Sequence, residues 1–306
     1  MDKQISSDRS LPIELTPENY YSLKTDWQYM SKSVFLGFEK CEAEELAELK
    51  DEWKPDDFKE PSGQPDPLIF GNYIHSYFQS EEAHQEYLKQ DKVRKEVYKR
   101  GNPKNELKKA YSDKGLAHNM IKKLNLNPKF VDAYRPRDPK GKEVIVTGKI
   151  DGYWWKGKID SLNLEEGFFC DLKTTKDIHA IEWIKDGDHN VKTNFIESSG
   201  YFMQMAIYQE LIRQTFGKTL VPLMFVVSKQ KIPELANVIF DQRELPDSID
   251  VKYMMDAEMD KVKELQPHFW RVMVGEERPK RCGHCDYCRY TDTNPDWILP
   301  TQIKTY

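Results

Sequence analysis

The sequence lacks a long apolar run and a strong excess of charge. Its 306 residues carry a formal net charge of −5, which argues against a protein whose whole surface binds nucleic acid but allows a local basic groove. No stretch of eighteen apolar residues occurs, so we expect no transmembrane helix. The first residues, 1–5, are polar and lack the apolar segment of a signal peptide. We therefore expect a cytoplasmic protein with no membrane partner.

A nucleotide-binding motif is also missing. Gly217-Lys218-Thr219 resembles the end of a P-loop, but Ile212 stands where the first glycine is needed, and the tripeptide follows a predicted helix. We therefore expect no ATP binding. The chain has no internal repeat or low-complexity tract, and its 39% hydrophobic content is enough for a sizeable core. The length suits one large domain or a core domain with embellishments.

Apolar periodicity divides the chain into helical and strand-rich parts. We expect an arm over 1–28, a single domain over 29–290 and a tail over 291–306. The domain is expected to contain a helical part over 29–135, a β-meander over 143–175, a helix and strand over 197–228, and a helix with a cysteine motif over 249–290. Individual helices are predicted at 31–50, 68–88, 103–124, 197–216 and 249–274, and further strands at 220–228 and 238–240.

The most informative pattern is the spacing of Asp160, Asp171 and Lys173, which reads D-x10-D-x-K. The flanking residues alternate and are rich in aromatic or branched types, so they predict two strands with a turn at 165–167. A symmetric hairpin about this turn places Asp160 opposite Asp171. Like charges opposite each other destabilise a sheet, and a cation between them would reverse that penalty. Lys173 leaves the same face as Asp171, so the three side chains predict a site for a divalent ion and a phosphate.

A less specific interpretation stands beside this one. Two acids and a lysine near a hairpin are common in a chain with 32% charged residues, so the spacing alone decides little. The neighbours Ile159, Phe169 and Leu172 mark these strands as core. Charges in core strands are rarely left unpaired. The apolar context therefore favours a functional site.

Four short motifs occur along the chain in a specific order. They are Tyr29-Met30-Ser31-Lys32-Ser33 with Phe38-Glu39-Lys40-Cys41-Glu42-Ala43, Gly71-Asn72-Tyr73-Ile74-His75, Asp160 with Asp171-Leu172-Lys173-Thr174-Thr175, and Gln204-Met205-Ala206-Ile207-Tyr208. Together they resemble the PD-(D/E)xK nuclease superfamily, and more narrowly its RecE-like (exonuclease VIII-type) phage recombination exonucleases. The resemblance implies an α/β fold with a mixed central β-sheet flanked by helices, preceded by an N-terminal helical region.

The resemblance also implies roles for the site residues. Asp160, Asp171 and His75 would bind Mg²⁺, and the imidazole ligand implies that Mn²⁺ supports activity as well. Lys173 would orient the attacking water or stabilise charge in the transition state. Gln204 and Tyr208 share a helix face and would contact the DNA backbone or the lysine. Without the resemblance, His75 reads as a structural histidine. For Gln204 and Tyr208, a core Tyr208 with an incidental Gln204 and a functional pair are then equally good interpretations.

Three neighbouring residues are expected to lie outside the site. Leu172 and Cys170 point to the opposite face of the strand by the two-residue period and should be buried in the core. Asp151 precedes Gly152, which marks it as a turn residue. A basic segment, 89–109, is read as a solvated helix face, with a surface that follows DNA phosphates as the alternative.

By resemblance, the activity is that of a metal-dependent, ATP-independent DNA exonuclease in a bacterial or phage-infected cell. It would degrade one strand of linear duplex DNA from an end, in the 5′-to-3′ direction. The remaining strand would serve homologous recombination through a single-strand annealing protein. RecE-like enzymes also suggest a ring-shaped tetramer. The alternatives are a non-catalytic DNA- or protein-binding module organised by a cysteine metal centre, and a Cas4-like end-trimming nuclease.

The five cysteines include a C-terminal cluster. Cys282, Cys285 and Cys288 form C-x2-C-x2-C, which predicts a metal site. Cas4-type and AddB-type enzymes are similar, because an upstream cysteine and a C-terminal trio hold a [4Fe–4S] cluster there, although their second gap is longer. Cys41 would be the upstream ligand. Zinc is the alternative, with His284 or Cys41 as fourth ligand; we rank the cluster above zinc and zinc above unligated thiols.

Overall fold

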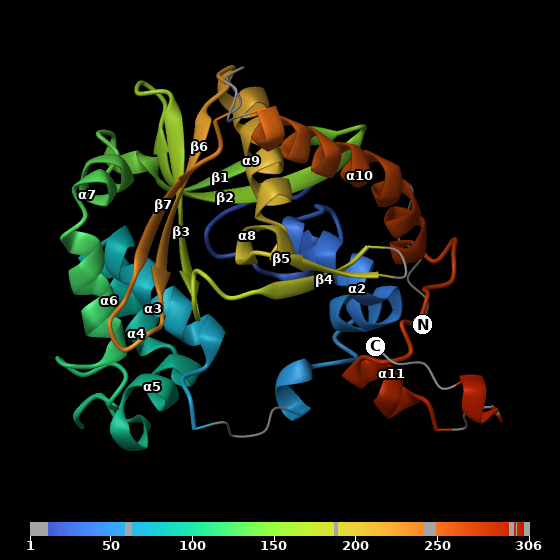
Figure 1. Ribbon diagram of the computed structural model, residues 1–306, viewed down its shortest axis with the longest axis horizontal. Helices are drawn as coiled ribbons and strands as arrows, with labels where there is room; N and C mark the ends of the chain where they lie inside the picture. Colours follow the sequence, from blue (N-terminus) through green and yellow to red (C-terminus); the bar gives the residue numbers. More distant parts are fainter. Residues whose placement is uncertain are drawn as a thin grey trace. The chain divides into compact units, whose positions relative to one another are not determined.

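The computed structural model describes residues 12–58, 63–186, 189–241, 249–293, 297 and 299–302. These residues form two compact units, each made from separate stretches of the chain. The first unit comprises Met1–Glu60, Gly148–Lys156 and Met259–Tyr306, and the second comprises Pro61–Thr147 and Gly157–Glu258. The sequence, by contrast, favours one domain over 29–290. Figure 1 shows the elements of both units in chain order.

A five-stranded mixed sheet has the order β1-β2-β3-β6-β7. Its strands are β1 (Lys142–Ile150), β2 (Tyr153–Asn163), β3 (Phe168–Thr175), β6 (Val221–Ser228) and β7 (Leu235–Ile239). The β2–β3 and β6–β7 pairs are antiparallel, whereas β3 and β6 are parallel. A parallel pair needs a crossover connection, and the helices between β3 and β6 supply it. The predicted mixed α/β fold is therefore confirmed. A separate antiparallel pair is formed by β4 (Glu182–Asp186) and β5 (His189–Thr193).

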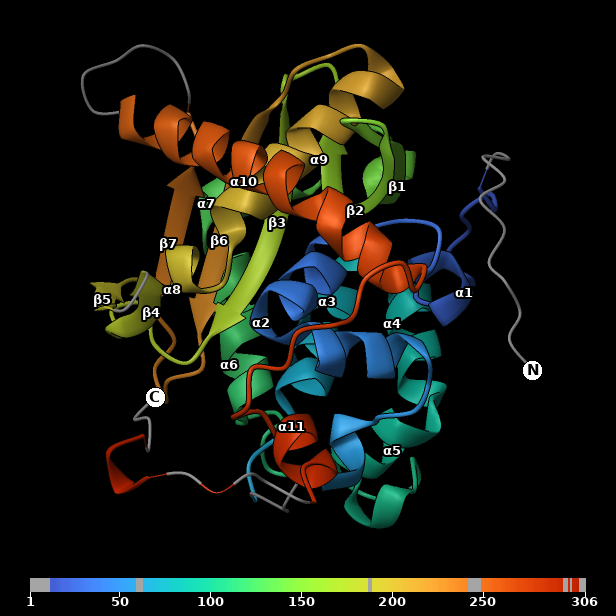
Figure 2. The same cartoon turned by 90° about the vertical axis from the view of Figure 1, so that its right-hand side faces the viewer.

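Helices cover both faces of β3 and β6 within the second unit (Figures 1 and 2). The elements of this unit's helical layers are α3 (Pro67–Gln79), α4 (Glu81–Lys89), α5 (Asp91–Val97), η2 (Lys99–Gly101), α6 (Leu116–Asn125), α7 (Pro128–Tyr134), η3 (Pro139–Gly141), α8 (Phe195–Ser198) and α9 (Tyr201–Phe216). Helices α3, α6 and α7 lie on one face, and α9 lies on the other. Phe70, Met120 and Phe130 pack with Leu172 and Phe225 in the core of the first of these faces.

Two of the predicted helices differ from the observed ones. The helix predicted over 68–88 is broken at Ser80, whose extended backbone ends α3 and whose side chain accepts a hydrogen bond from the Ala83 N–H at the start of α4. The helix predicted over 103–124 begins only at Leu116. Gly115 precedes it at a position where an added Cβ would lie 2.4 Å from the Lys109 carbonyl oxygen. The cap at Ser80 divides the first predicted helix, and close backbone packing at Gly115 accompanies the late start of the second. The apolar period indicates neither feature.

The first unit is organised around aromatic residues. Its helices are α1 (Leu23–Asp26), α2 (Lys32–Leu49), η1 (Pro55–Phe58), α11 (Asp286–Thr291), η4 (Pro300–Gln302) and the part of α10 (Ile249–Met273) that follows residue 258. Ser31 caps α2 by accepting a hydrogen bond from the Val34 N–H. Phe35 and Phe38 pack on Phe269 of α10. Trp155, which is fully buried, donates a hydrogen bond from Nε1 to Gln266 at 2.8 Å.

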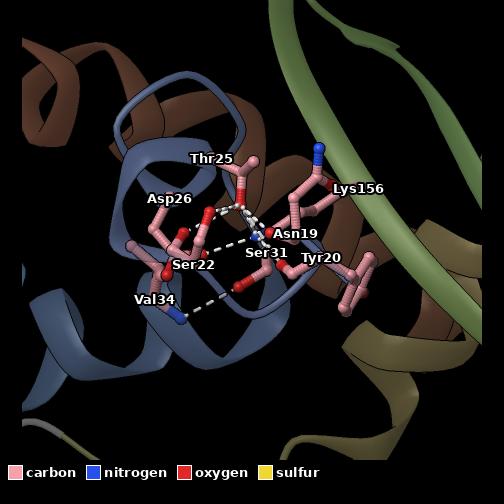
Figure 3. A network of polar contacts seen from close by, with 8 residues as sticks. All are labelled: Asn19, Tyr20, Ser22, Thr25, Asp26, Ser31, Val34 and Lys156. Carbon is pink, nitrogen blue, oxygen red and sulfur yellow. Dashed lines mark hydrogen bonds and ion pairs between the residues drawn. The ribbon is translucent and has the colours of Figure 1, made fainter. Parts of the chain in front are cut away.

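Residues 12–28 are packed rather than forming the arm expected from the sequence. Lys156 on β2 is buried, and its Nζ lies 2.7 Å from an Asp26 carboxylate oxygen. The same ammonium donates hydrogen bonds to the Tyr20 carbonyl oxygen at 2.6 Å and to Thr25 Oγ1 at 2.9 Å. Figure 3 shows these residues around the turn that precedes α2. The polar composition of residues 12–28 gave no indication of this packing, because a buried lysine far along the chain, Lys156, makes the contacts.

No helix within the described residues is both long enough and apolar enough to span a bilayer. The expected tail over 291–306 lies mostly outside the described residues.

We predict that Lys156→Met lowers the free energy of unfolding by about 2–3 kcal/mol, because it leaves the Asp26 carboxylate without its ammonium partner. Asp26 is 18% exposed at the side chain, so the loss is below that of a fully buried pair. Urea denaturation measures it. The exposed Lys24→Met is the control, and equal stability of the two variants would contradict the anchoring role.

Candidate active site and cysteine cluster

The predicted hairpin is formed by β2 and β3. Ser161 pairs with Cys170, Leu162 with Phe169 and Asn163 with Phe168. In this register the next pair is Asp160 opposite Asp171, as the sequence predicts. The turn is closed by a hydrogen bond from the Gly167 N–H to the Asn163 carbonyl oxygen, and Gly167 has a φ of 84°, which a glycine adopts without strain.

The Asp171 carboxylate is surrounded by donors of its own unit. Lys173 Nζ lies 2.8 Å from Oδ2 and donates a hydrogen bond to Oδ1 at 3.0 Å. Gln204 Nε2 on α9 donates a second hydrogen bond to Oδ1 at 2.7 Å. Although Oδ2 is ion-paired with the lysine, it is buried and has no hydrogen bond of good geometry. One buried carboxylate oxygen is therefore incompletely satisfied.

The Asp160 carboxylate interacts with a histidine and the backbone. His75 Nδ1 on α3 lies 3.3 Å from Asp160 Oδ2, and the Leu172 N–H donates a hydrogen bond to the same oxygen at 2.7 Å. Burial raises the pKa of Asp160, but His75, Lys173 and the Leu172 N–H outweigh it and lower the pKa to about 2. Asp160 is therefore ionised at neutral pH.

The pKa values of the other site residues, Asp171, Lys173 and His75, are raised. Burial, together with the Asp160 charge, raises the pKa of Asp171 in spite of the nearby Lys173. Burial would lower the pKa of Lys173 and of His75, but the Asp171 and Asp160 carboxylates outweigh it and raise both. The sequence predicts that a cation must relieve the Asp160–Asp171 repulsion; the protein's own lysine, histidine and amide groups already offset part of it.

The Q-x3-Y residues on α9 have separate surroundings. Gln204 is buried and contacts the Asp171 carboxylate, not the lysine that the resemblance offers as its partner. Tyr208 packs over Gly157 on β2, where an added Cβ would lie 2.9 Å from its ring, and near the ring of Phe169. Gln204 therefore joins the site directly, whereas the described contacts of Tyr208 are with the sheet.

The residues expected to face away from the site do so. Leu172 and Cys170 are fully buried in the core formed with α3, α6 and α7. Asp151 is an exposed turn residue with a φ of 46°.

In the basic segment 89–109, four side chains form ion pairs with neighbouring acids: Lys89, Arg94, Lys99 and Lys108. These pairs fit the solvated-face interpretation of that segment.

The sequence missed two residues at the site. Tyr201 places its ring centroid 5.2 Å from Lys173 Nζ; its position three residues before Gln204 on α9 could have indicated this shared face. Glu143 on β1 offers a carboxylate oxygen within 4.8 Å of ligand atoms of both His75 and Asp160. No motif marks Glu143, and its left-handed backbone, with a φ of 53°, cannot be read from the sequence.

The residues present suit a divalent metal ion. An imidazole nitrogen of His75 on α3 and carboxylate oxygens of Asp160 on β2 and Glu143 on β1 lie within 4.8 Å of one another, whereas Asp171 on β3 is not part of this group. Hard oxygen ligands are those that Mg²⁺ and Mn²⁺ prefer. The buried Asp171 Oδ2 that lacks a hydrogen bond is a further place where a cation can satisfy an acceptor. The chemistry of this donor set therefore fits the ion that the resemblance implies.

The first unit holds a second group of metal-ligating residues. The sulfurs of Cys41, Cys282, Cys285 and Cys288 all lie within 4.8 Å of one another, and Cys41 and Cys288 are 3.7 Å apart. Backbone N–H groups of Cys285 and Cys288 donate to the sulfurs of Cys282 and Cys285. Cys41 thus takes the fourth place predicted for it, while the His284 ring contacts the Cys282 carbonyl group.

Local structure brings Cys41 to the trio. The backbone of Cys41 is extended, with φ −160° and ψ 104°, and interrupts α2. The next residue, Glu42, is buried and accepts a hydrogen bond from the Lys280 N–H at 2.8 Å, while the Ala43 N–H donates to the Lys280 carbonyl oxygen at 3.0 Å. These bonds fix the segment that leads into Cys282 against the kink. The four cysteine sulfurs therefore form one compact group that could bind a metal.

Comparison with known proteins agrees with this geometry. The family described as "PDDEXK-like domain of unknown function (DUF3799)" matches residues 31–291. No curated protein matches the chain. Among solved structures, the chain is similar to a crystal structure described as a "Putative exonuclease" from Eubacterium rectale, with 28% sequence identity and a TM-score of 0.74 over 94% of this chain and 97% of that one. These matches do not distinguish the RecE-like group, which stays a prediction. The chain belongs to the PDDEXK-like domain family DUF3799, within the PD-(D/E)xK nuclease superfamily.

Proposed function

We propose that this protein is a metal-dependent, ATP-independent DNA exonuclease that degrades one strand of linear duplex DNA. The observation that supports this most strongly is the β2–β3 hairpin, where Asp160 and Asp171 come opposite each other beside the Lys173 ammonium in a PDDEXK-like domain. The likeness to a structure described as an exonuclease favours action at DNA ends. The 5′-to-3′ direction, a role in recombination with an annealing protein, and a ring tetramer rest on the RecE-like resemblance.

Each residue has a separate task in this proposal. A divalent ion bound by Asp160, Asp171 and His75 would polarise the scissile phosphate and acidify water. Asp160, which is ionised at neutral pH, supplies the permanent negative charge of the site. Gln204 holds Asp171 in its orientation through the 2.7 Å hydrogen bond. Lys173, whose raised pKa keeps it charged, stabilises the negative charge that develops on the phosphate oxygens.

We also propose that the four cysteines bind a structural metal ion, and that this ion is zinc. Four thiolates about 2.3 Å from one zinc ion lie about 3.8 Å apart at the corners of a tetrahedron. The observed sulfur separation of 3.7 Å and the 4.8 Å limit for the whole set match that size. In a [4Fe–4S] cluster each thiolate binds a different iron atom, so the sulfurs lie further apart. The sulfur spacing therefore favours zinc over the iron–sulfur cluster that the sequence ranks first.

End-labelled linear duplex DNA incubated with Mg²⁺ and no ATP tests the proposed activity. We expect stepwise loss of one strand from wild-type protein, no loss from covalently closed circular DNA, and a drop of about a hundredfold or more in Asp171→Asn. Asp151→Asn, in the exposed turn, is the matched control and should keep full activity. Full activity in Asp171→Asn, or no activity in wild-type protein with Mg²⁺ or Mn²⁺, would reject the assignment.

Lys173→Met should separate metal binding from chemistry. We expect the variant to bind Mn²⁺ at least as well as the wild type, because the lysine competes with the ion for Asp171, and to lose turnover by about a hundredfold or more. Calorimetry and single-turnover digestion measure the two effects, with the exposed Lys176→Met as control. A variant that loses Mn²⁺ affinity while its turnover at saturating metal is unchanged shows that the assigned role is wrong.

Cys41→Ser should release the metal of the cysteine cluster and lower the melting temperature, because this centre connects α2 to the C-terminal segment. Protein purified without oxygen should contain one zinc ion per chain and no visible absorbance. Cys170→Ala is the control, since Cys170 lies in the other unit's core and should leave the zinc content unchanged. A broad visible absorbance with about four iron atoms per chain would support the iron–sulfur alternative, and absence of both metals would leave unligated thiols.

A further inference from the structure

Glu143 lies at the metal site without any role in the four motifs. Ligand atoms of His75, Glu143 and Asp160 are all within 4.8 Å of one another. They come from three elements, α3, β1 and β2, so their convergence is a property of the fold and not of one local turn. Asp171 is not a member of this group; Lys173 and Gln204 contact its carboxylate, whose Oδ2 still lacks a hydrogen bond.

The group is enclosed and electrostatically strained without a cation. The side chains of Glu143 and Asp160 are only 15% and 12% exposed, and that of His75 is 24% exposed. Two carboxylates this close repel each other. Cationic groups lie beside both acids: Lys158 Nζ is 2.6 Å from a Glu143 carboxylate oxygen, and His75 Nδ1 is 3.3 Å from Asp160 Oδ2.

The position of the Glu143 carboxylate also has a backbone cost. Glu143 has a φ of 53° inside β1, a left-handed conformation that non-glycine residues rarely adopt because it is strained. A residue with an extended backbone at position 143 would point its side chain in another direction. The left-handed backbone of Glu143 therefore contributes to placing its carboxylate beside His75 and Asp160.

We infer that Glu143 is a further protein ligand for the divalent ion held by His75 and Asp160, and that Lys158 is the counter-ion that this ion displaces. The inference rests on the proposed function, because it concerns the same metal site. It adds a carboxylate oxygen donor from β1 to the ligands Asp160, Asp171 and His75, and the four motifs place no ligand on that strand. Lys158 then acts as a stand-in cation that holds the Glu143 carboxylate in place while no metal is bound.

Two variants of the same ion pair should have opposite effects on metal binding. Glu143→Gln keeps the side-chain size but removes the charge, so we expect Mn²⁺ affinity to fall on the order of tenfold or more. Lys158→Met removes the competing ammonium, so we expect Mn²⁺ affinity to stay equal or increase. A structural ion pair predicts a different result: both variants would lower the melting temperature in EDTA to a similar extent, and neither would change the affinity for Mn²⁺.

Calorimetric titration of the full chain with Mn²⁺ and with Mg²⁺, together with melting temperatures in EDTA and in Mn²⁺, distinguishes these outcomes without any use of nuclease activity. A smaller Mn²⁺-induced increase in melting temperature for Glu143→Gln than for wild-type protein supports the inference. Equal affinity in Glu143→Gln and wild type overturns it, while leaving the proposed function intact. If wild-type protein itself binds neither ion at this site, the proposed function fails as well, and the two failures are thereby separated.

Discussion

The central constraint of this structure is the placement of two carboxylates on neighbouring strands of a buried sheet. Asp160 and Asp171 come opposite each other in the β2–β3 register, where like charges destabilise the pairing. The surrounding groups are arranged to offset that repulsion: Lys173 and Gln204 contact Asp171, and His75 and the Leu172 N–H contact Asp160. Donors come from α3, α9 and the hairpin itself, so the fold of the second unit is what assembles the site.

Successive side chains of β3 point to opposite faces of the sheet, so core residues alternate with residues of the candidate active site. Cys170 and Leu172 are fully buried against α3, α6 and α7, whereas Asp171 and Lys173 belong to the polar site with α9. The parallel pairing of β3 with β6 requires the crossover that contains α8 and α9, and this crossover delivers Gln204 and Tyr201. In the first unit, the kink of α2 at Cys41 performs a comparable task by bringing a distant thiol to the C-terminal trio.

Features set by local pattern and short spacing could be predicted from the sequence. The turn at 165–167 fixes the register of Asp160 and Asp171, and the two-residue period places Lys173, Leu172 and Cys170 on the correct faces. These outcomes depend on neighbours within a few residues, which the sequence displays directly.

Features set by long-range packing could not be predicted in this way. Glu143 reaches His75 and Asp160 only because β1 carries a left-handed residue beside β2. The packing of residues 12–28 depends on one buried lysine, Lys156, far along the chain. The resemblance ranks an iron–sulfur cluster first for the four cysteines, whereas the distances between their sulfurs are visible only in three dimensions. Contacts between residues far apart in the chain cannot be read from composition or local spacing.

The central claim is that the β2–β3 hairpin and α3 hold a divalent metal ion. The most direct measurement is the anomalous diffraction of manganese in crystals grown with Mn²⁺. We predict one strong anomalous peak within coordination distance of Asp160, with Asp171 and His75 as neighbours. A peak elsewhere in the second unit, or none at this position in crystals of protein that digests DNA with Mn²⁺, would contradict the account.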